Sequence, residues 1–258
     1  MQNRTITLVL PLFLIACASG PPVRGTSVDV PVSDAKTKSV SATLYEPGGG
    51  GPFPVVILLN GCAGVGNDAP IFYRVNEDYL PKGIATLVVD SFTRRGINEV
   101  CTNAKLLDES IAFRVSDVYA AMEWLSARPE IDSKHIFLQG YSHGAMTAIA
   151  ATDAQLPQNS HREVAGVVAY YPYCSPSSRF SVPTIILIGR KDDWTPPERC
   201  ENIVDKTNVE ITVYPNALHA FAEPGGYRQF RGHSFAYDAA ATNDGQLRAL
   251  ALIQALNK

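Results

Sequence analysis

The sequence has 258 residues, of which 46% are hydrophobic and 18% charged, and its formal net charge is -3 at pH 7. This composition is typical of a globular protein with one substantial hydrophobic core, and one domain is the default at this length. The slightly acidic balance argues against a nucleic acid as partner, because proteins that bind the phosphate backbone present a basic surface.

The N-terminus has the pattern of a secretion signal. Arg4 is followed by an apolar stretch over residues 6–16, which is too short to span a membrane as a helix. The stretch ends in Leu14-Ile15-Ala16-Cys17. This ending resembles the bacterial lipobox, in which a cysteine after a small residue is lipidated and begins the mature chain. We therefore expect residues 1–16 to be a signal peptide and Cys17 to carry a lipid that attaches the protein to a membrane.

Residues 17–25 are small and proline-rich, as in a tether between a lipid anchor and a folded domain. Ala18 after the cysteine favours the outer membrane if the host is Gram-negative. The alternative is cleavage by ordinary signal peptidase around residues 18–20, which leaves a soluble periplasmic or secreted protein. Both interpretations place the domain, residues 26–258, outside the cytoplasm.

Cysteine content agrees with export. Lipidation of Cys17 leaves four of the five cysteines: Cys62, Cys101, Cys174 and Cys200. In an oxidising compartment an even number of cysteines favours disulfides, and four cysteines allow three pairings. Unpaired buried thiols are the alternative.

The domain begins with two short predicted strands, residues 26–32 and 40–45, and a glycine-rich turn follows at residues 48–51. Continuous apolar runs then alternate with helical patterns. Runs without polar alternation are typical of strands that are buried on both faces, so we predict an α/β fold with a mainly parallel central sheet and helices on both faces. The runs cover residues 54–59, 84–89, 135–138, 164–170 and 184–188, and a further strand is expected at residues 209–214.

Two helices are predicted from their apolar spacing. The first covers residues 105–128 and ends before Pro129, and the second covers residues 244–256. The first has one stripe of core-facing residues, which are Leu107, Ile111, Val115, Val118, Met122 and Leu125.

The most informative segment for chemistry is Gly140-Tyr141-Ser142-His143-Gly144, which follows the strand at residues 135–138 and precedes a run of small residues. Gly-x-Ser-x-Gly in a strand–turn–helix context is typical of the nucleophile turn of α/β-hydrolases. The glycines allow a sharp turn that exposes the hydroxyl. Ser142 is therefore the predicted nucleophile.

A serine nucleophile needs a base and an orienting carboxylate, which follow it in this fold in the order acid, then histidine. His219 follows the strand at residues 209–214 and is the predicted base, with His233 as the second choice. Asp192 follows the strand at residues 184–188 and is the predicted acid, with the adjacent Asp193 as the alternative.

Acyl transfer also needs two backbone N–H groups for the developing oxyanion. One is expected from His143, directly after the nucleophile, and the other from Cys62 or, as second choice, Ala63 in the glycine-rich loop after residues 54–59. This loop has no signature of a phosphate-binding loop. We predict neither a cofactor nor a metal site, because the histidines lack ligand spacing.

These features together resemble the dienelactone hydrolase family of α/β-hydrolases. Two departures are visible: members with dienelactone hydrolase activity carry a cysteine nucleophile where this chain has Ser142, and Asn60 stands where a histidine commonly precedes the oxyanion loop. The sheet order of the family implies that Cys62 pairs with Cys101 and Cys174 with Cys200. The matching pieces are Asn60-Gly61-Cys62 with Gly64, residues 90–96, Arg114 with Asp117, and residues 140–144, 189–196 and 219–221.

We therefore expect a serine hydrolase that cleaves a small-molecule carboxylic ester or lactone through an acyl-enzyme. A peptidase, amidase or acyltransferase on the same fold is one alternative. A non-catalytic envelope lipoprotein is another. The sequence makes no prediction of the oligomeric state. Candidates for the substrate pocket are Phe92, Tyr141, Trp194, Phe221 and the loop of residues 224–237.

Overall fold

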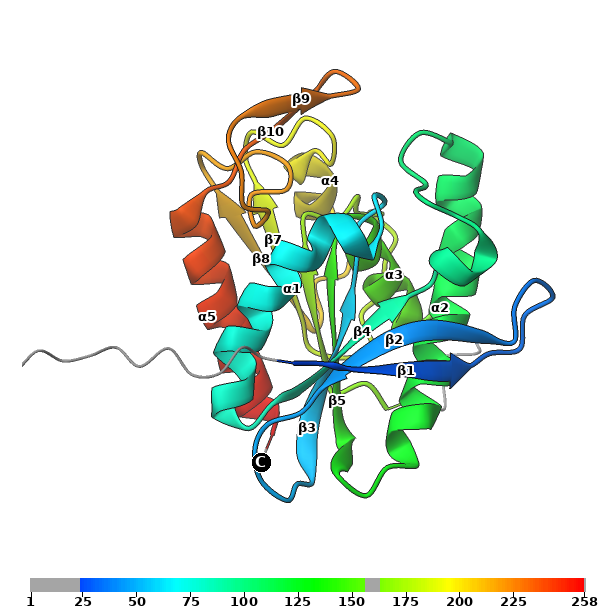
Figure 1. Ribbon diagram of the computed structural model, residues 1–258. Helices are drawn as coiled ribbons and strands as arrows, with labels where there is room; N and C mark the ends of the chain where they lie inside the picture. The colour runs from blue at the N-terminus through cyan, green and yellow to red at the C-terminus, as the bar shows by residue number, and fades with distance from the viewer. Residues whose placement is uncertain (1–23, 156–162, 258) are drawn as a thin grey trace, which may run out of the picture.

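The computed structural model describes residues 24–155 and 163–257 (Figure 1). The predicted signal peptide, the predicted lipidation residue Cys17 and most of the tether lie outside the described residues. Within the described ranges, none of the helices combines the length and apolar character needed to cross a membrane.

The centre of the domain is an eight-stranded sheet with the order β1-β2-β4-β3-β5-β6-β7-β8. The pairs β1–β2 and β2–β4 are antiparallel, and all other neighbours are parallel. This arrangement confirms the predicted α/β-hydrolase fold. The strands are β1 (Thr26–Pro31), β2 (Ser39–Tyr45), β3 (Phe53–Leu59), β4 (Ala85–Asp90), β5 (Ile131–Tyr141), β6 (Gly166–Tyr170), β7 (Thr184–Gly189) and β8 (Val209–Tyr214).

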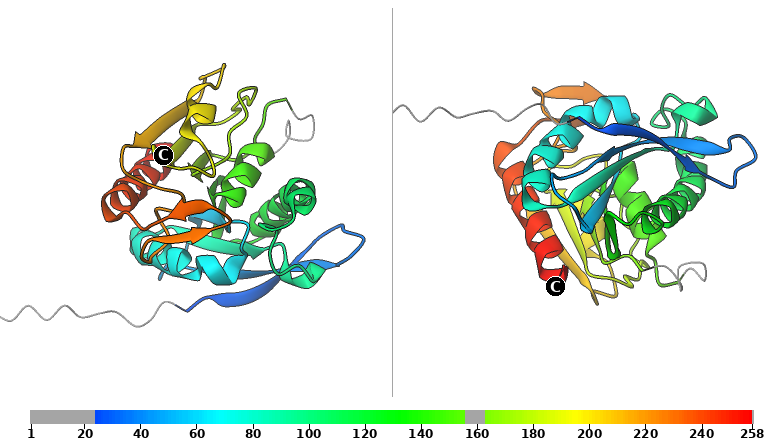
Figure 2. Two further views of the ribbon diagram at one scale, coloured as in Figure 1. Left: turned by 90° about the horizontal axis from the view of Figure 1, so that it is seen from above. Right: turned by 60° about the horizontal axis from the view of Figure 1, so that its bottom comes forward.

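Helices cover both faces of the sheet (Figure 2). Helices α2 (Ala104–Ser126) and α3 (His143–Ala151) pack on one face, and α1 (Val65–Tyr79) and α5 (Ala239–Leu256) on the other. Strand β3 shows why the apolar runs lack polar alternation. Val55 and Ile57 join the core under α2 and α3, whereas Val56 and Leu58 join the core under α1 and α5.

The helix predictions differ from the structure in two places. Helix α1 was not predicted, although its buried residues Ile71, Phe72, Val75 and Tyr79 have helical spacing. Helix α5 begins five residues earlier than predicted, because the Asp238 carboxylate caps it by accepting a hydrogen bond from Ala241 N–H (3.0 Å). The predicted bounds of α2 are correct to within two residues.

The remaining elements are short. The antiparallel hairpin β9–β10 lies at the top of the molecule in Figure 1, and Phe235 of β10 forms a bridge with His219. The short elements are η1 (Leu80–Lys82), η2 (Thr93–Arg95), α4 (Pro197–Glu201), β9 (Arg228–Phe230) and β10 (His233–Phe235).

Both disulfides form with the implied pairing, Cys62–Cys101 and Cys174–Cys200. The strands that precede the partners are neighbours in the sheet, β3 with β4 and β6 with β7. Each disulfide therefore joins two segments that follow the carboxyl ends of adjacent parallel strands, and Cys200 lies in the short helix α4.

Candidate active site

Ser142 lies in a strained turn between β5 and α3. Its backbone angles are φ 49° and ψ -113°, a conformation that a non-glycine residue adopts only when the surrounding structure enforces it. The two glycines of the motif are needed for space, because a Cβ at Gly140 would overlap the carbonyl of Gly144 and one at Gly144 would overlap the carbonyl of Leu59. The turn thus holds the Ser142 side chain at the carboxyl end of the sheet.

The structure brings Ser142, His219 and Asp192 together. His219 Nε2 lies 3.1 Å from Ser142 Oγ, and His219 Nδ1 lies 2.8 Å from Asp192 Oδ2. Asp192 and His219 are both buried. The remaining acceptor capacity of Asp192 is used by the N–H groups of Trp194 (3.0 Å) and Thr195 (2.8 Å) and by the Thr195 hydroxyl (2.7 Å). These donors fix the carboxylate, so it can orient the imidazole.

Asp193 and His233, the alternatives for the acid and the base, contact residues outside the Ser142–His219–Asp192 line. Asp193 accepts hydrogen bonds from Ser234 N–H (3.1 and 3.2 Å) and therefore holds the hairpin β9–β10. His233 lies 3.0 Å from the Asp193 carbonyl and stacks on Trp194, with ring centroids 4.7 Å apart. Asp192, not Asp193, is the aspartate next to the imidazole of His219.

The two predicted oxyanion donors belong to two segments, the loop after β3 and the start of α3. Cys62 lines the same cavity as Ser142, and its carbonyl accepts a hydrogen bond from Val100 N–H (2.9 Å) next to the disulfide to Cys101. His143 is the first residue of α3, and the first N–H groups of a helix have no acceptor within the helix. Both N–H groups are therefore candidates for binding a developing oxyanion.

A buried arginine connects these two segments. Arg114 on α2 is fully buried, donates to the carbonyl of Asn60 (2.7 Å), and lies 2.5 Å from His143 Nδ1. His143 Nε2 lies 2.8 Å from the carbonyl of Leu107, so the neutral ring with its proton on Nε2 satisfies both contacts. Burial, and then the charge of Arg114, lowers the pKa of His143 to about 3. The sequence analysis named Arg114 as a residue shared with the family, but it did not predict that Arg114 would contact the loop at Asn60.

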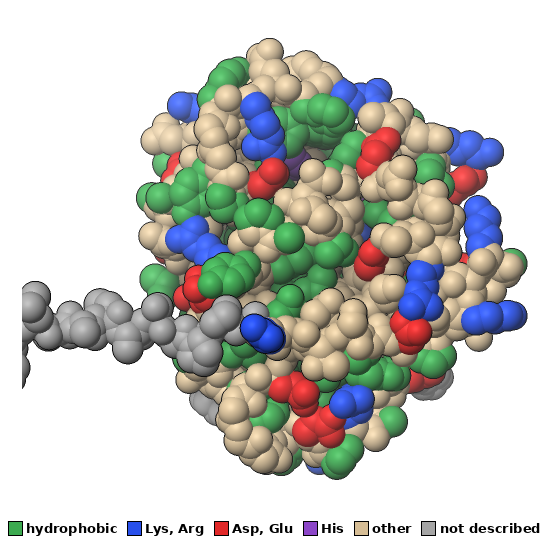
Figure 3. Space-filling view, viewed as in Figure 1, with side chains coloured by type: hydrophobic (Ala, Val, Ile, Leu, Met, Phe, Trp, Pro, Cys, Tyr) green, Lys and Arg blue, Asp and Glu red, His purple; other side chains and the backbone are tan. Residues whose placement is uncertain are grey.

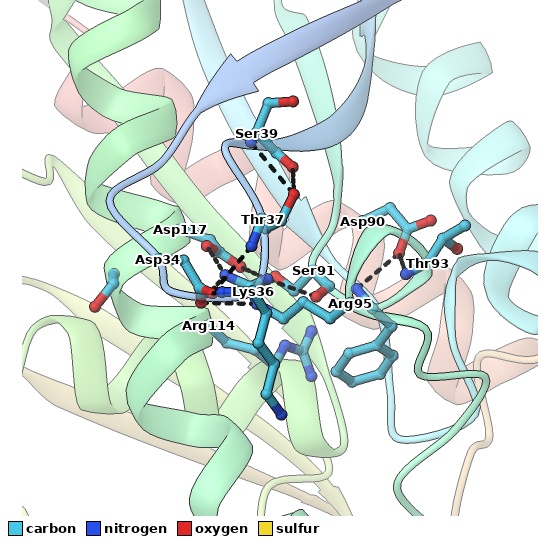
Figure 4. A network of polar contacts seen from close by, with 12 residues as sticks. Asp34, Lys36, Thr37, Ser39, Asp90, Ser91, Thr93, Arg95, Arg114 and Asp117 are labelled. Carbon is cyan, nitrogen blue, oxygen red and sulfur yellow. Dashed lines mark hydrogen bonds and ion pairs between the residues drawn. The ribbon is translucent and has the colours of Figure 1, made fainter.

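A second arginine fastens the loop after β4, as Figure 4 shows. Arg95 binds both carboxylate oxygens of Asp117 (2.8 Å each), the carboxylate of Asp34 (3.0 Å) and the carbonyl of Ser91 (2.6 Å). The network ties residues 90–96 to α2 and to the loop between β1 and β2. Residues 90–96, which resemble the family sequence, therefore stabilise the packing of this loop and do not line the cavity at Ser142.

A cavity of about 460 Å³ opens above Ser142. In Figure 3 a histidine side chain is visible in a hollow that is bordered by hydrophobic side chains and, on one side, by a basic and an acidic side chain. Tyr141 and Trp194 line the cavity as predicted, whereas Phe92 and Phe221 are buried and do not line it. Of the predicted loop, the lining residues are Arg228, Gln229, Phe230 and Phe235.

Asp68 is a cavity residue that the sequence analysis missed. It is buried on α1 and accepts a hydrogen bond from Gly61 N–H, with Oδ2 2.6 Å from N. Burial raises the pKa of Asp68 to about 7, against the lowering effect of this hydrogen bond. Within residues 24–155 and 163–257, no three His, Cys, Asp or Glu side chains come together as metal ligands.

Comparison with known proteins gives the family. The model of the dienelactone hydrolase family matches residues 40–256. The chain belongs to the dienelactone hydrolase family. It is also 28% identical over 223 residues to two Mycobacterium tuberculosis proteins that are provisionally named phosphoribosyl transferases. The match covers 83% of this chain and 46% of theirs, so the chain spans about half the length of these curated relatives.

Solved structures of the dienelactone hydrolase type share the fold. A provisionally assigned dienelactone hydrolase from Klebsiella pneumoniae superposes with a TM-score of 0.70 at 19% identity, covering 90% of this chain and 98% of that one. A dienelactone hydrolase-like promiscuous phosphotriesterase from metagenomic libraries gives a TM-score of 0.70 at 20% identity, with the same coverage. Because the sequence identities are 20% or lower, these two structures show that the fold is shared and nothing further.

Proposed function

We propose that this member of the dienelactone hydrolase family is a serine hydrolase that cleaves carboxylic esters or lactones through an acyl-enzyme. The observation that supports the proposal most directly is the continuous hydrogen-bonded line from Ser142 through His219 to Asp192, with distances of 3.1 and 2.8 Å. A base within hydrogen-bond distance is what converts a weakly nucleophilic hydroxyl into an attacking group.

In the proposed reaction, Ser142 Oγ attacks the ester carbonyl carbon while His219 Nε2 takes the hydroxyl proton. Asp192 holds the proton on His219 Nδ1 and stabilises the imidazolium that forms. The backbone N–H groups of Cys62 and His143 bind the oxyanion. The imidazolium then protonates the departing alcohol, which leaves an acyl group on Ser142. Water, deprotonated by His219, attacks this acyl group. The bond from the acyl carbon to Ser142 Oγ then breaks, the imidazolium returns its proton to Oγ, and the acid is released.

The test is covalent labelling. Wild-type protein and Ser142→Ala are treated with a fluorophosphonate probe, and labelling is followed by intact mass. We expect one adduct on the wild type and none on the variant. Absence of labelling on a folded wild-type protein would contradict the proposal and favour the non-catalytic lipoprotein. Labelling without hydrolysis of any ester would favour the peptidase, amidase or acyltransferase alternative.

We also propose that the protein is exported and anchored in the bacterial cell envelope by a lipid on Cys17. The support is the sequence of residues 1–17 and two disulfides, which form in oxidising compartments. The test is metabolic labelling with a fatty acid in a bacterial host. Incorporation into the wild type and none into Cys17→Ala is expected, whereas equal incorporation would contradict it. Absence of a label in both, with release of a soluble protein, would support ordinary signal cleavage.

A further inference from the structure

The cavity above Ser142 has more acidic than basic side chains. Asp68, Glu99 and Glu223 line it, and Arg228 is the one Lys or Arg among its described lining residues. Arg228 Nη2 lies 2.6 Å from Glu223 Oε2, so this pair is neutral as a unit. Asp68 and Glu99 therefore have no unpaired cation among the described lining residues, and the charge that acts on Asp68 from outside the lining is that of the buried Arg114, which lowers its pKa.

The two remaining carboxyl groups lie at different depths. Asp68 is beside the nucleophile, because a Cβ at Gly61 would lie 3.5 Å from Asp68 Oδ2 and 3.7 Å from Ser142 Cβ. Glu99 is half-buried and accepts a hydrogen bond from Thr102 N–H (2.9 Å). Hydrogen bonds from the Thr102 hydroxyl and N–H lower the pKa of Glu99, so Glu99 is ionised at neutral pH. The exposed Arg231 donates to the Cys101 carbonyl (3.0 Å), and its charge contributes to the lowered pKa of Glu99.

The largest uncharged side chains of the wall are aromatic, and Asn67, Thr102 and Gln229 are among its polar uncharged members. Trp194 stacks on Phe230, with centroids 5.8 Å apart, and Tyr171 and Phe235 flank the imidazole of His219 at 5.0 and 5.3 Å. Aromatic faces bind apolar groups and attract cations through their negative quadrupole. An anion over such a face would lose hydration without gaining a hydrogen bond from the ring.

We infer that this cavity selects esters whose acyl group is uncharged or positively charged and rejects esters that carry an anionic group near the scissile bond. The inference rests on the proposed ester hydrolase activity. It follows from the sign of the cavity charge above pH 7, where Asp68 is ionised together with Glu99, because like charges within several ångströms in a site partly shielded from water repel measurably.

The test compares three 4-nitrophenyl esters that share a leaving group. They are the uncharged 5,5-dimethylhexanoate, its cationic isostere 4-(trimethylammonio)butanoate, and the anionic 4-sulfobutanoate, with rates corrected for spontaneous hydrolysis. For the full-length protein at low salt and pH 8, we expect kcat/KM to be at least about tenfold higher for the uncharged than for the anionic ester. The cationic ester should equal or exceed the uncharged one. The ratio should shrink at 1 M NaCl, where the screening length is about 3 Å.

Two variants separate the cavity charge from the overall charge. Glu99→Gln should lower the preference for the uncharged over the anionic ester about threefold. Glu210→Gln removes the same charge from an exposed residue of β8 that pairs with Arg248, and should leave the preference unchanged. Equal rates for the uncharged and anionic esters, or equal shifts in both variants, would overturn the inference while the proposed function stands. No hydrolysis of any ester, with no fluorophosphonate labelling, would overturn both.

Discussion

The two disulfides provide a matched pair of perturbations. They close loops with sequence separations of 39 and 26 residues. In the chain-entropy model these loops correspond to about 4 and about 3.5 kcal/mol of stability at 25 °C. Cys62→Ala/Cys101→Ala and Cys174→Ala/Cys200→Ala should therefore lose similar stability, with Tm lower by roughly 7–16 °C in each double variant.

The effects on catalysis should differ. Cys62 and Cys101 both line the cavity at Ser142, and the Cys62 N–H is a proposed oxyanion donor. Loss of one such donor costs about 10²–10³ in kcat, so partial loosening of this loop should lower kcat about tenfold or more. Cys174 instead lines a separate cavity that does not include Ser142. Its variant should keep kcat within about threefold.

The assay is ester hydrolysis at 20 °C, where both variants remain folded, together with thermal unfolding followed by circular dichroism. Both proteins are produced in an oxidising compartment, and the wild type is the reference. An equal loss of kcat in the two double variants would refute the reasoning, because it would mean that stability, and not the position of the Cys62 loop, controls the activity.

Three further predictions follow from single contacts. Asp192→Ala should lower kcat/KM by about 10³–10⁴ in steady-state ester hydrolysis, because the imidazole loses its orienting carboxylate, whereas Asp193→Ala should change it less than tenfold; equal losses would contradict the assignment. Arg114→Lys should lower kcat about 10–100-fold and leave KM within about threefold, because an ammonium cannot bridge Asn60 and His143 as a planar guanidinium does; an unchanged kcat would show that the bridge is not needed. Asp68→Asn tests the burial of the Asp68 carboxyl group. The folded protein keeps the Asp68 proton up to about pH 7, whereas the ordinary pKa of this group is 3.8. Between these pH values the unfolded state binds fewer protons than the folded state, so the wild type loses stability as the pH rises. Relative to wild type, the variant should gain up to about 4 kcal/mol between pH 4 and pH 8 in urea unfolding, and a pH-independent difference would contradict the raised pKa.

Much of the fold could be predicted because its strands are buried on both faces. The run at residues 54–59 and the Gly-x-Ser-x-Gly turn carry local signals, since apolar side chains fill the interior on both faces of the sheet and the turn has space only for glycine at positions 140 and 144. The sheet order and both disulfide pairings came from the resemblance to the family. The spacing of His219 and Asp192 after two strands was sufficient to propose them together.

The missed features depend on how the elements pack. Asp68 is only seven residues after Gly61, but its carboxylate reaches the Gly61 N–H from helix α1, and α1 was not predicted. The hairpin β9–β10 has strands of three residues, too short for a periodic signal, and is held by Asp193 and Trp194. Arg114 did have a signal: Ser110, Arg114 and Asp117 share one helical face, which the structure buries.

The most direct test of the central claim is the hydrolysis of 4-nitrophenyl butyrate by the purified protein, measured beside Ser142→Ala and His219→Ala at equal concentration. The account predicts turnover by the wild type and a loss of at least about 10³-fold in kcat in each variant, with unchanged circular dichroism. Turnover that survives in Ser142→Ala would contradict the assignment of Ser142 as nucleophile. Absence of turnover in a folded wild type across acyl chains of different length would contradict ester hydrolysis itself.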